Sequence, residues 1–190
     1  MKVIFLDIDG VLNSFQTFRE IYYEYKKTGR RRVAIDENKV LLLKQIVDNT
    51  NAMLVLSSSW RNFGRMENDR LVTNNKNLRD LVSILAKYGL FIYDITPKSR
   101  EGKREVEIKK WLCNNSDNVE KFIVIDDDID DLESFKDKEL FKTIFIKIDS
   151  EGNYLADESG LTINHVKDAI DKLNNKKDYH ARMETKIKKI

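Results

Sequence analysis

Short apolar runs recur along the chain, and the stretches between them have the apolar spacing of helices. The runs are VIFL (3–6), AMLVL (52–56), LFIYDI (90–95), FIVI (122–125) and TIFIKI (143–148). Four of them are typical of strands buried on both faces of a parallel sheet, and 90–95 fits that pattern least well. A chain that alternates such strands with helices is constrained to a layered α/β fold.

Four amphipathic segments lie between or after these runs. They are 36–49, a segment from about Asn77 to Gly89, 105–112 and 164–173. Asp36 and Thr162 precede the first and last of them in the position of a helix cap, and Gly89 suits a left-handed helix end. Strand and helix therefore alternate, which predicts a three-layer α/β domain with a parallel central sheet.

Composition narrows the function classes. The 190 residues suffice for one core, so we expect a single domain. The net charge is only +2, which gives no overall field toward nucleic acid or membrane. The single cysteine rules out an intrachain disulfide and a Cys-rich zinc site. A single cysteine also fits a reducing, cytoplasmic setting. No apolar run approaches the roughly 20 residues that span a bilayer, so we expect no membrane partner.

Three domain boundaries follow from these patterns. Residues 1–174 are predicted to form the α/β domain, and 14–34 a small cap or lid segment within it. Residues 175–190 are polar and basic with weak helical periodicity, and we interpret them as a C-terminal extension.

Carboxylates and hydroxyls follow three of the predicted strands. Asp7 and Asp9 come directly after the first run, Ser57 and Ser58 after the second, and an acidic cluster beginning with Asp126 and Asp127 after the fourth. Ligands of open α/β sheets bind beyond the carboxyl ends of the strands. Carboxylates crowded into such a crevice need a cation, and oxygen ligands without Cys or His favour Mg²⁺.

Two cations stand at a helix start near this crevice. Lys103 and Arg104 precede EVEIKKWL, where a positive charge is unfavourable to the helix dipole. Their position indicates an anionic ligand, and phosphate fits a metal, a hydroxyl, a fixed cation and a nucleophilic carboxylate.

The same residues carry a resemblance to a known family. DIDGVLN resembles motif I of the haloacid dehalogenase (HAD) superfamily, LVLSSSWR its motif II, GKREVEIKKWL its motif III and FIVIDDD its acidic motif IV. With SSSWR and the late GLT before a helix, the set is most similar to the small HAD phosphatase domains associated with RNA-repair proteins. The resemblance spans roughly residues 3–173.

The resemblance implies a Rossmann-like HAD fold with a minimal cap, and a role for each matching residue. Asp7 would be the nucleophile that forms an aspartyl-phosphate, and Asp9 the acid and base. Mg²⁺ would be held by Asp7, the Asp9 carbonyl and either Asp127 or Asp126, with Asp127 favoured. Phosphate would be bound by Ser57, with Ser58 as the alternative, and by Lys103 or Arg104. Asn13 would orient the first loop, and Asn13 or Arg61 would contact the substrate.

The expected activity is that of a Mg²⁺-dependent phosphomonoesterase acting on a phosphorylated substrate. A short cap leaves the site open to a large substrate, and residues 21–32 mix tyrosines with lysines and arginines. Both features favour a nucleic-acid 3′ end or a nucleotide. Two alternatives remain: a receiver-like phospho-accepting module, and a catalytically silent nucleic-acid-binding domain.

Overall fold

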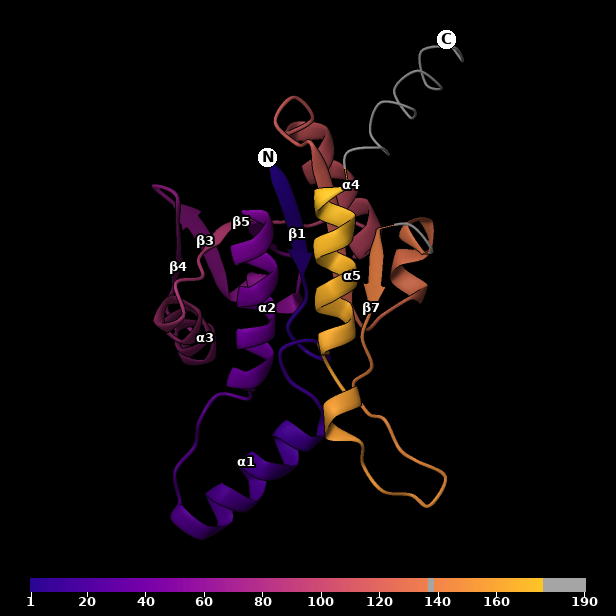
Figure 1. The fold of residues 1–190 in the computed structure, drawn as a ribbon. Helices are drawn as coiled ribbons and strands as arrows, with labels where there is room; N and C mark the ends of the chain where they lie inside the picture. The colour runs from indigo at the N-terminus through magenta and orange to yellow at the C-terminus, as the bar shows by residue number, and fades with distance from the viewer. Residues whose placement is uncertain (137–138, 176–190) are drawn as a thin grey trace.

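The computed structural model describes residues 1–136 and 139–175, and these form a three-layer α/β fold (Figure 1). The central sheet has five strands in the order β5-β2-β1-β6-β7, and every neighbouring pair is parallel. The strands are β1 (Lys2–Leu6), β2 (Met53–Leu56), β5 (Ile92–Ile95), β6 (Lys121–Asp126) and β7 (Leu140–Lys142). The predicted fold class is therefore confirmed.

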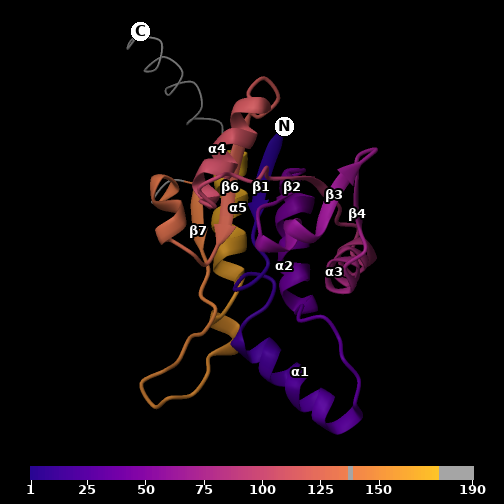
Figure 2. The same cartoon turned by 180° about the vertical axis from the view of Figure 1, so that it is seen from behind.

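Helices cover both faces of the sheet (Figures 1 and 2). One face packs against α2 (Glu37–Thr50), α3 (Lys76–Lys87) and α5 (Ile163–Asn174). The other packs against α4 (Arg104–Asn114) and the short 3₁₀ helix η2 (Asp130–Phe135). Alternate residues of β1 divide between the two cores, since Ile4 and Leu6 face the first and Val3 and Phe5 the second. This two-sided burial explains why the strands read as continuous apolar runs.

The predicted helix ends are largely confirmed. The Asp36 side chain accepts a hydrogen bond from the Asn38 backbone at the start of α2, and Thr162 caps α5. Gly89, which follows α3, has a φ of 73°. That left-handed conformation suits glycine because no Cβ opposes it.

The prediction of a strand over 143–148 is wrong. The fifth strand is β7, and Thr143 donates its backbone N–H to the carbonyl of Asp126, the last residue of β6. Past that point β6 offers no further backbone to pair with. Ile144, Ile146 and Ile148 are each 39% or more exposed, so this apolar run is a surface segment.

A hairpin that the apolar pattern did not indicate follows β2. After the 3₁₀ helix η1 (Ser59–Phe63), strands β3 (Gly64–Glu67) and β4 (Arg70–Thr73) pair antiparallel. The two residues between them, Asn68 and Asp69, both have positive φ. Two-residue hairpin loops need positive φ, which Asn and Asp adopt more readily than most other residues with a side chain.

Helix α1 (Phe15–Thr28) lies beyond the carboxyl ends of the strands, apart from the three layers (Figures 1 and 2). Its first turn contacts the segment after β7: the Phe15 ring is 4.8 Å from the Tyr154 ring, and the Phe18 ring 5.9 Å from the Phe145 ring. The third short 3₁₀ helix, η3 (Ala156–Glu158), ends this segment. The structure thus places a separate element over the ligand-binding edge of the sheet. Within the described residues, no helix has the length and apolar character that crossing a membrane requires.

Candidate active site

The ends of β1 and β6 bring the acidic residues together. The chain runs outward from β1 to β5 on one side and then returns to β6 on the other, so the switch point lies between β1 and β6. Asp7 continues β1, and its backbone N–H donates to the Ile125 carbonyl at 3.0 Å. Asp126 is the last residue of β6. Both carboxyls are buried at this edge of the sheet.

Arg104 joins these two carboxylates. Its Nη1 lies 3.0 Å from Asp7 Oδ1 and also donates to Asp126 Oδ2. The other predicted cation, Lys103, is exposed at the cap of α4, where its side chain makes no capping hydrogen bond. The structure therefore brings Arg104, and not Lys103, against the nucleophile candidate.

Burial changes the ionisation of both carboxyls. Desolvation raises the pKa of Asp7 from 3.8 to about 7 although the Arg104 charge acts in the opposite direction. Burial likewise raises the pKa of Asp126 to about 6. The charged forms of both groups therefore need more positive charge than one arginine supplies.

A third carboxylate completes a cluster that could hold a metal ion. Asp7, Asp126 and Asp127 each offer one oxygen, and these oxygens lie within 4.8 Å of one another. Burial also raises the pKa of Asp127. Three hard oxygen donors, two of them buried, match the ligand preference of Mg²⁺. The residues present therefore fit the ion that the sequence predicts.

Two other acidic residues of the run after β6, Asp128 and Asp131, accept hydrogen bonds from backbone N–H groups. The Asp128 side chain accepts from the backbone of Asp130 and Asp131, and Asp131 accepts from the Arg104 backbone N–H at 2.8 Å. This last bond holds the first turn of α4 in place beside the carboxylate cluster.

The Asp9 carboxylate accepts hydrogen bonds from two side chains that do not belong to the carboxylate cluster. Trp60 Nε1 donates to Asp9 Oδ2 at 2.9 Å, and Asn13 Nδ2 donates to Asp9 Oδ1 at 2.8 Å. Asn13 is fully buried, and its side-chain oxygen, Oδ1, accepts a hydrogen bond from the Gly10 backbone N–H. Asn13 therefore orders the loop after β1, and Trp60 links that loop to η1. No local pattern in the sequence indicates the contact between Trp60 and Asp9, because it joins residues 51 positions apart.

Ser57 and Ser58 are both fully buried at the end of β2. The Ser57 backbone donates to the Leu6 carbonyl, which continues the pairing with β1. Its hydroxyl has no hydrogen-bond partner among the described residues. The Ser58 hydroxyl accepts from the Trp60 backbone N–H at the start of η1, and the Ser58 side chain acts to lower the pKa of Asp7, against the larger effect of burial. A buried hydroxyl without a hydrogen-bond partner, at the end of the strand that pairs with β1, is a ready donor for an anionic ligand.

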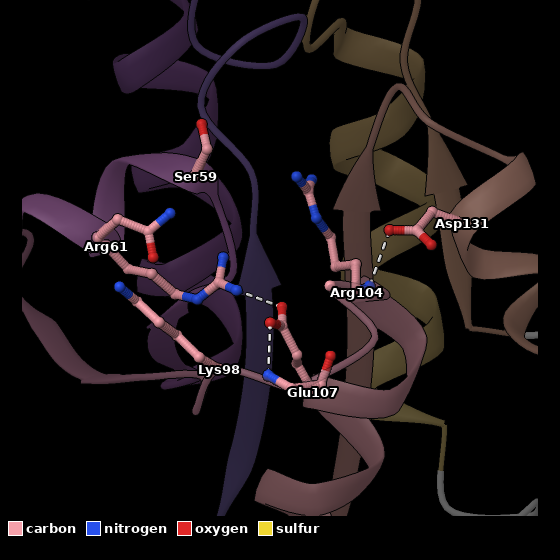
Figure 3. A pocket seen from close by; sticks show the side chains of 9 residues that line it. Ser59, Arg61, Lys98, Arg104, Glu107 and Asp131 are labelled. Carbon is pink, nitrogen blue, oxygen red and sulfur yellow. Dashed lines mark hydrogen bonds and ion pairs between the residues drawn. The ribbon is translucent and has the colours of Figure 1, made fainter.

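Arg61 lines a cavity of ≈ 320 Å³ that also contains Lys98 and Arg104 (Figure 3). Its side chain is only 7% exposed, donates to the Ser58 carbonyl at 2.7 Å and pairs with Glu107. Glu107 in turn accepts from the Ser99 backbone N–H. Glu107 was not among the sequence candidates. The available signal was its place one turn before Trp111, on the face of α4 that is buried.

The comparison with protein families agrees with this geometry. The chain belongs to the family described as the HAD domain in Swiss Army Knife RNA repair proteins, whose model matches residues 3–158. The resemblance seen in the four motifs is thereby confirmed. No curated protein and no solved structure matches the chain. Membership supports a general role as a HAD-type hydrolase, and HAD domains generally use Mg²⁺.

Mg²⁺ affinity should depend on pH. A protonated carboxyl cannot serve as a ligand, so proton and cation compete for Asp7 and Asp126. We expect the affinity, measured by titration calorimetry, to fall by up to about tenfold per pH unit for each competing proton below pH 7, and to level off above it. In the metal-free protein these raised pKa values add stability as the pH falls from about 7 toward 4. A Mg²⁺ affinity that does not change between pH 5 and pH 8 would contradict this prediction.

Gly10→Ala should disturb the metal cluster. Gly10 has a φ of +74°, and a Cβ there would meet Asp127 Oδ2 at 2.2 Å. We expect loss of about 10- to 100-fold in Mg²⁺ affinity, because the ligand must move. Gly89→Ala is the matched control: φ is +73°, and a Cβ would meet no described atom within 4 Å. Both variants bear the left-handed strain of about 1–2 kcal/mol, but only the first should lose metal. Equal Mg²⁺ affinities in calorimetry would refute the clash.

Proposed function

We propose that the protein is a Mg²⁺-dependent phosphomonoesterase that works through an aspartyl-phosphate on Asp7. The observation that carries the proposal is the meeting of Asp7, Asp126, Asp127 and Arg104 at the ends of β1 and β6, with Asp9 two residues after Asp7. Phosphoryl transfer requires positioning and charge neutralisation above all, and this cluster is suited to both.

Each residue has a role in the proposed first half of the reaction. A carboxylate oxygen of Asp7 attacks phosphorus while the bond to the ester oxygen breaks. Asp9 donates its proton to that oxygen, and the alcohol leaves. The Ser57 hydroxyl and the Arg104 guanidinium hold the phosphoryl oxygens. The Ser58 side chain acts to lower the pKa of Asp7, which favours the charged form that attacks.

In the second half, Asp9 accepts a proton from a water molecule that attacks the phosphorus of the aspartyl-phosphate. The bond to Asp7 breaks, inorganic phosphate leaves, and Asp9 is protonated again for the next cycle. Asp7, Asp126 and Asp127 would hold Mg²⁺, with the Asp9 carbonyl as a further ligand. When bound, the ion would neutralise the charge on the phosphoryl oxygens.

We further propose a nucleic-acid 3′ end or a nucleotide as the substrate. The description of the family mentions RNA repair, and α1 presents exposed tyrosines and basic residues beyond the sheet. We interpret 14–34, which includes α1, as a small lid over the site. The extension predicted for 175–190 lies outside the described residues apart from Asn175.

A substrate screen tests this function. Phosphate release is measured from 3′- and 5′-phosphorylated oligonucleotides, mononucleotides and sugar phosphates, each with and without Mg²⁺. We expect turnover that requires Mg²⁺ and is fastest with nucleotidic substrates. A receiver-like module would accept one phosphoryl group without repeated release, and a silent binding domain would release none. Faster turnover of sugar phosphates would refute the substrate proposal while leaving the chemistry intact.

A further inference from the structure

A second cavity, of ≈ 520 Å³, opens directly beside Asp9. Four aromatic side chains line it: Phe18 of α1, Trp60 and Phe63 of η1, and Phe145 of the segment after β7. We propose that this aromatic cleft binds the nucleobase of the phosphorylated nucleotide. The inference rests on the proposed function and names the part of the substrate that the site selects.

The chemistry of the leaving group points to this cleft. In the proposed reaction Asp9 protonates the ester oxygen, so the organic part of the substrate must extend from that oxygen past Asp9. Asp9 is itself a wall of the aromatic cleft. The cationic cavity with Lys98 and Arg104 lies on the phosphate side of the site. The cationic cavity would thus hold the anionic part of the substrate, and the aromatic cleft its aromatic base.

The aromatic rings are exposed to an extent that a structural role does not require. Phe63 is 57% exposed and Phe18 42% exposed. Trp60 is fixed by its hydrogen bond to Asp9, so its ring stands beside the reacting group. A solvent-open cleft lined by apolar rings and a few polar groups is typical of a ligand site. Flat rings on several sides suit a flat aromatic ligand.

Polar groups in the cleft favour a base over a purely apolar ligand. Asn75 and Asn77, at the start of α3, line it together with Ser59. Amide and hydroxyl groups hydrogen-bond to the edges of bases, while aromatic side chains stack on their faces. The four elements that supply the cleft's side chains, α1, η1, α3 and the segment after β7, come from different parts of the chain and meet beside Asp9.

Paired substrates and one variant test the cleft. The substrates are a 3′-phosphorylated oligonucleotide and the same oligonucleotide with an abasic 3′-terminal nucleotide, each assayed for kcat/KM. We expect the wild type to prefer the base-containing end, and Phe63→Ala to lose roughly tenfold on that end alone, the size of one stacking interaction. Phe91→Ala is the matched control, because Phe91 is 70% exposed at a site distant from the cleft lining. Phe91→Ala should leave kcat/KM unchanged for both substrates.

A binding measurement decides the point independently of turnover. Of the two tryptophans, Trp111 is buried and Trp60 lines the cleft, so quenching of fluorescence reports on Trp60. In Asp7→Asn, adenosine 3′-monophosphate should quench the signal and ribose 5-phosphate should not. The additional change Phe63→Ala should weaken quenching about tenfold.

The outcomes separate the cleft from the chemistry. Equal use of base-containing and abasic ends, or equal loss on both in Phe63→Ala, overturns the cleft and leaves the phosphatase standing. If the wild type releases no phosphate from either of these substrates, nor from any substrate of the screen, the proposed function fails and quenching alone decides. Quenching specific to the base then still supports the cleft, and its absence overturns it.

Discussion

Replacing Asp7 by asparagine is expected to lower phosphate release by at least about three orders of magnitude, the scale seen when a catalytic nucleophile is removed. The amide is a poor nucleophile, and it removes one of the three carboxylates that could hold a metal ion. The shape of the side chain is retained, so the loss reflects chemistry. Steady-state phosphate release at saturating Mg²⁺ gives the measurement.

Two controls separate this loss from damage to the fold. Asp130→Asn makes the same change at an exposed residue of the acidic run and should keep wild-type turnover. Asp7→Asn should melt no lower than wild type in metal-free buffer at pH 8, because it removes a buried carboxyl whose pKa is raised to about 7 and which is costly to ionise. Undiminished turnover in Asp7→Asn would end the aspartyl-phosphate scheme.

The parts of the site that follow strands could be predicted from the sequence. Asp7, Ser57 and Asp126 each stand at the end of an apolar run, and parallel strands bring such positions to one edge. The position of Lys103 and Arg104 at a helix start indicated an anionic ligand, and the structure brings Arg104 of the two against Asp7. These inferences need only local pattern and the rule that parallel strands share a direction.

Contacts between distant segments could not be predicted in this way. The bonds from Trp60 to Asp9 and from Arg61 to Glu107 depend on how η1 lies against β1 and α4, which no local pattern specifies. The run TIFIKI has the composition of a strand, yet β6 ends before it, and Ile148 instead forms an isolated antiparallel bridge to Tyr154. Whether such a segment forms a strand depends more on an available pairing partner than on the β-propensity of its residues.

Glu107→Ala is expected to lower the free energy of unfolding by about 3–5 kcal/mol, because it leaves the Arg61 charge buried without its partner. The two side chains are only 7% and 4% exposed. Arg61 also donates to the Ser58 carbonyl, so its displacement should disturb the loop that carries Ser57 and Ser58, the serines proposed to bind phosphate. Urea unfolding measures the change in stability.

The exposed pair Arg65–Glu67 supplies the matched control, since its side chains are 70% and 46% exposed. Glu67→Ala should lower the free energy of unfolding by less than about 1 kcal/mol, as is usual for surface ion pairs. The double variant Arg61→Met with Glu107→Leu should recover most of the loss, because no unpaired charge then stays buried. If Glu107→Ala destabilises the protein no more than Glu67→Ala does, the pair has no structural role. Arg61 would then be available to contact substrate in the cationic cavity that it lines.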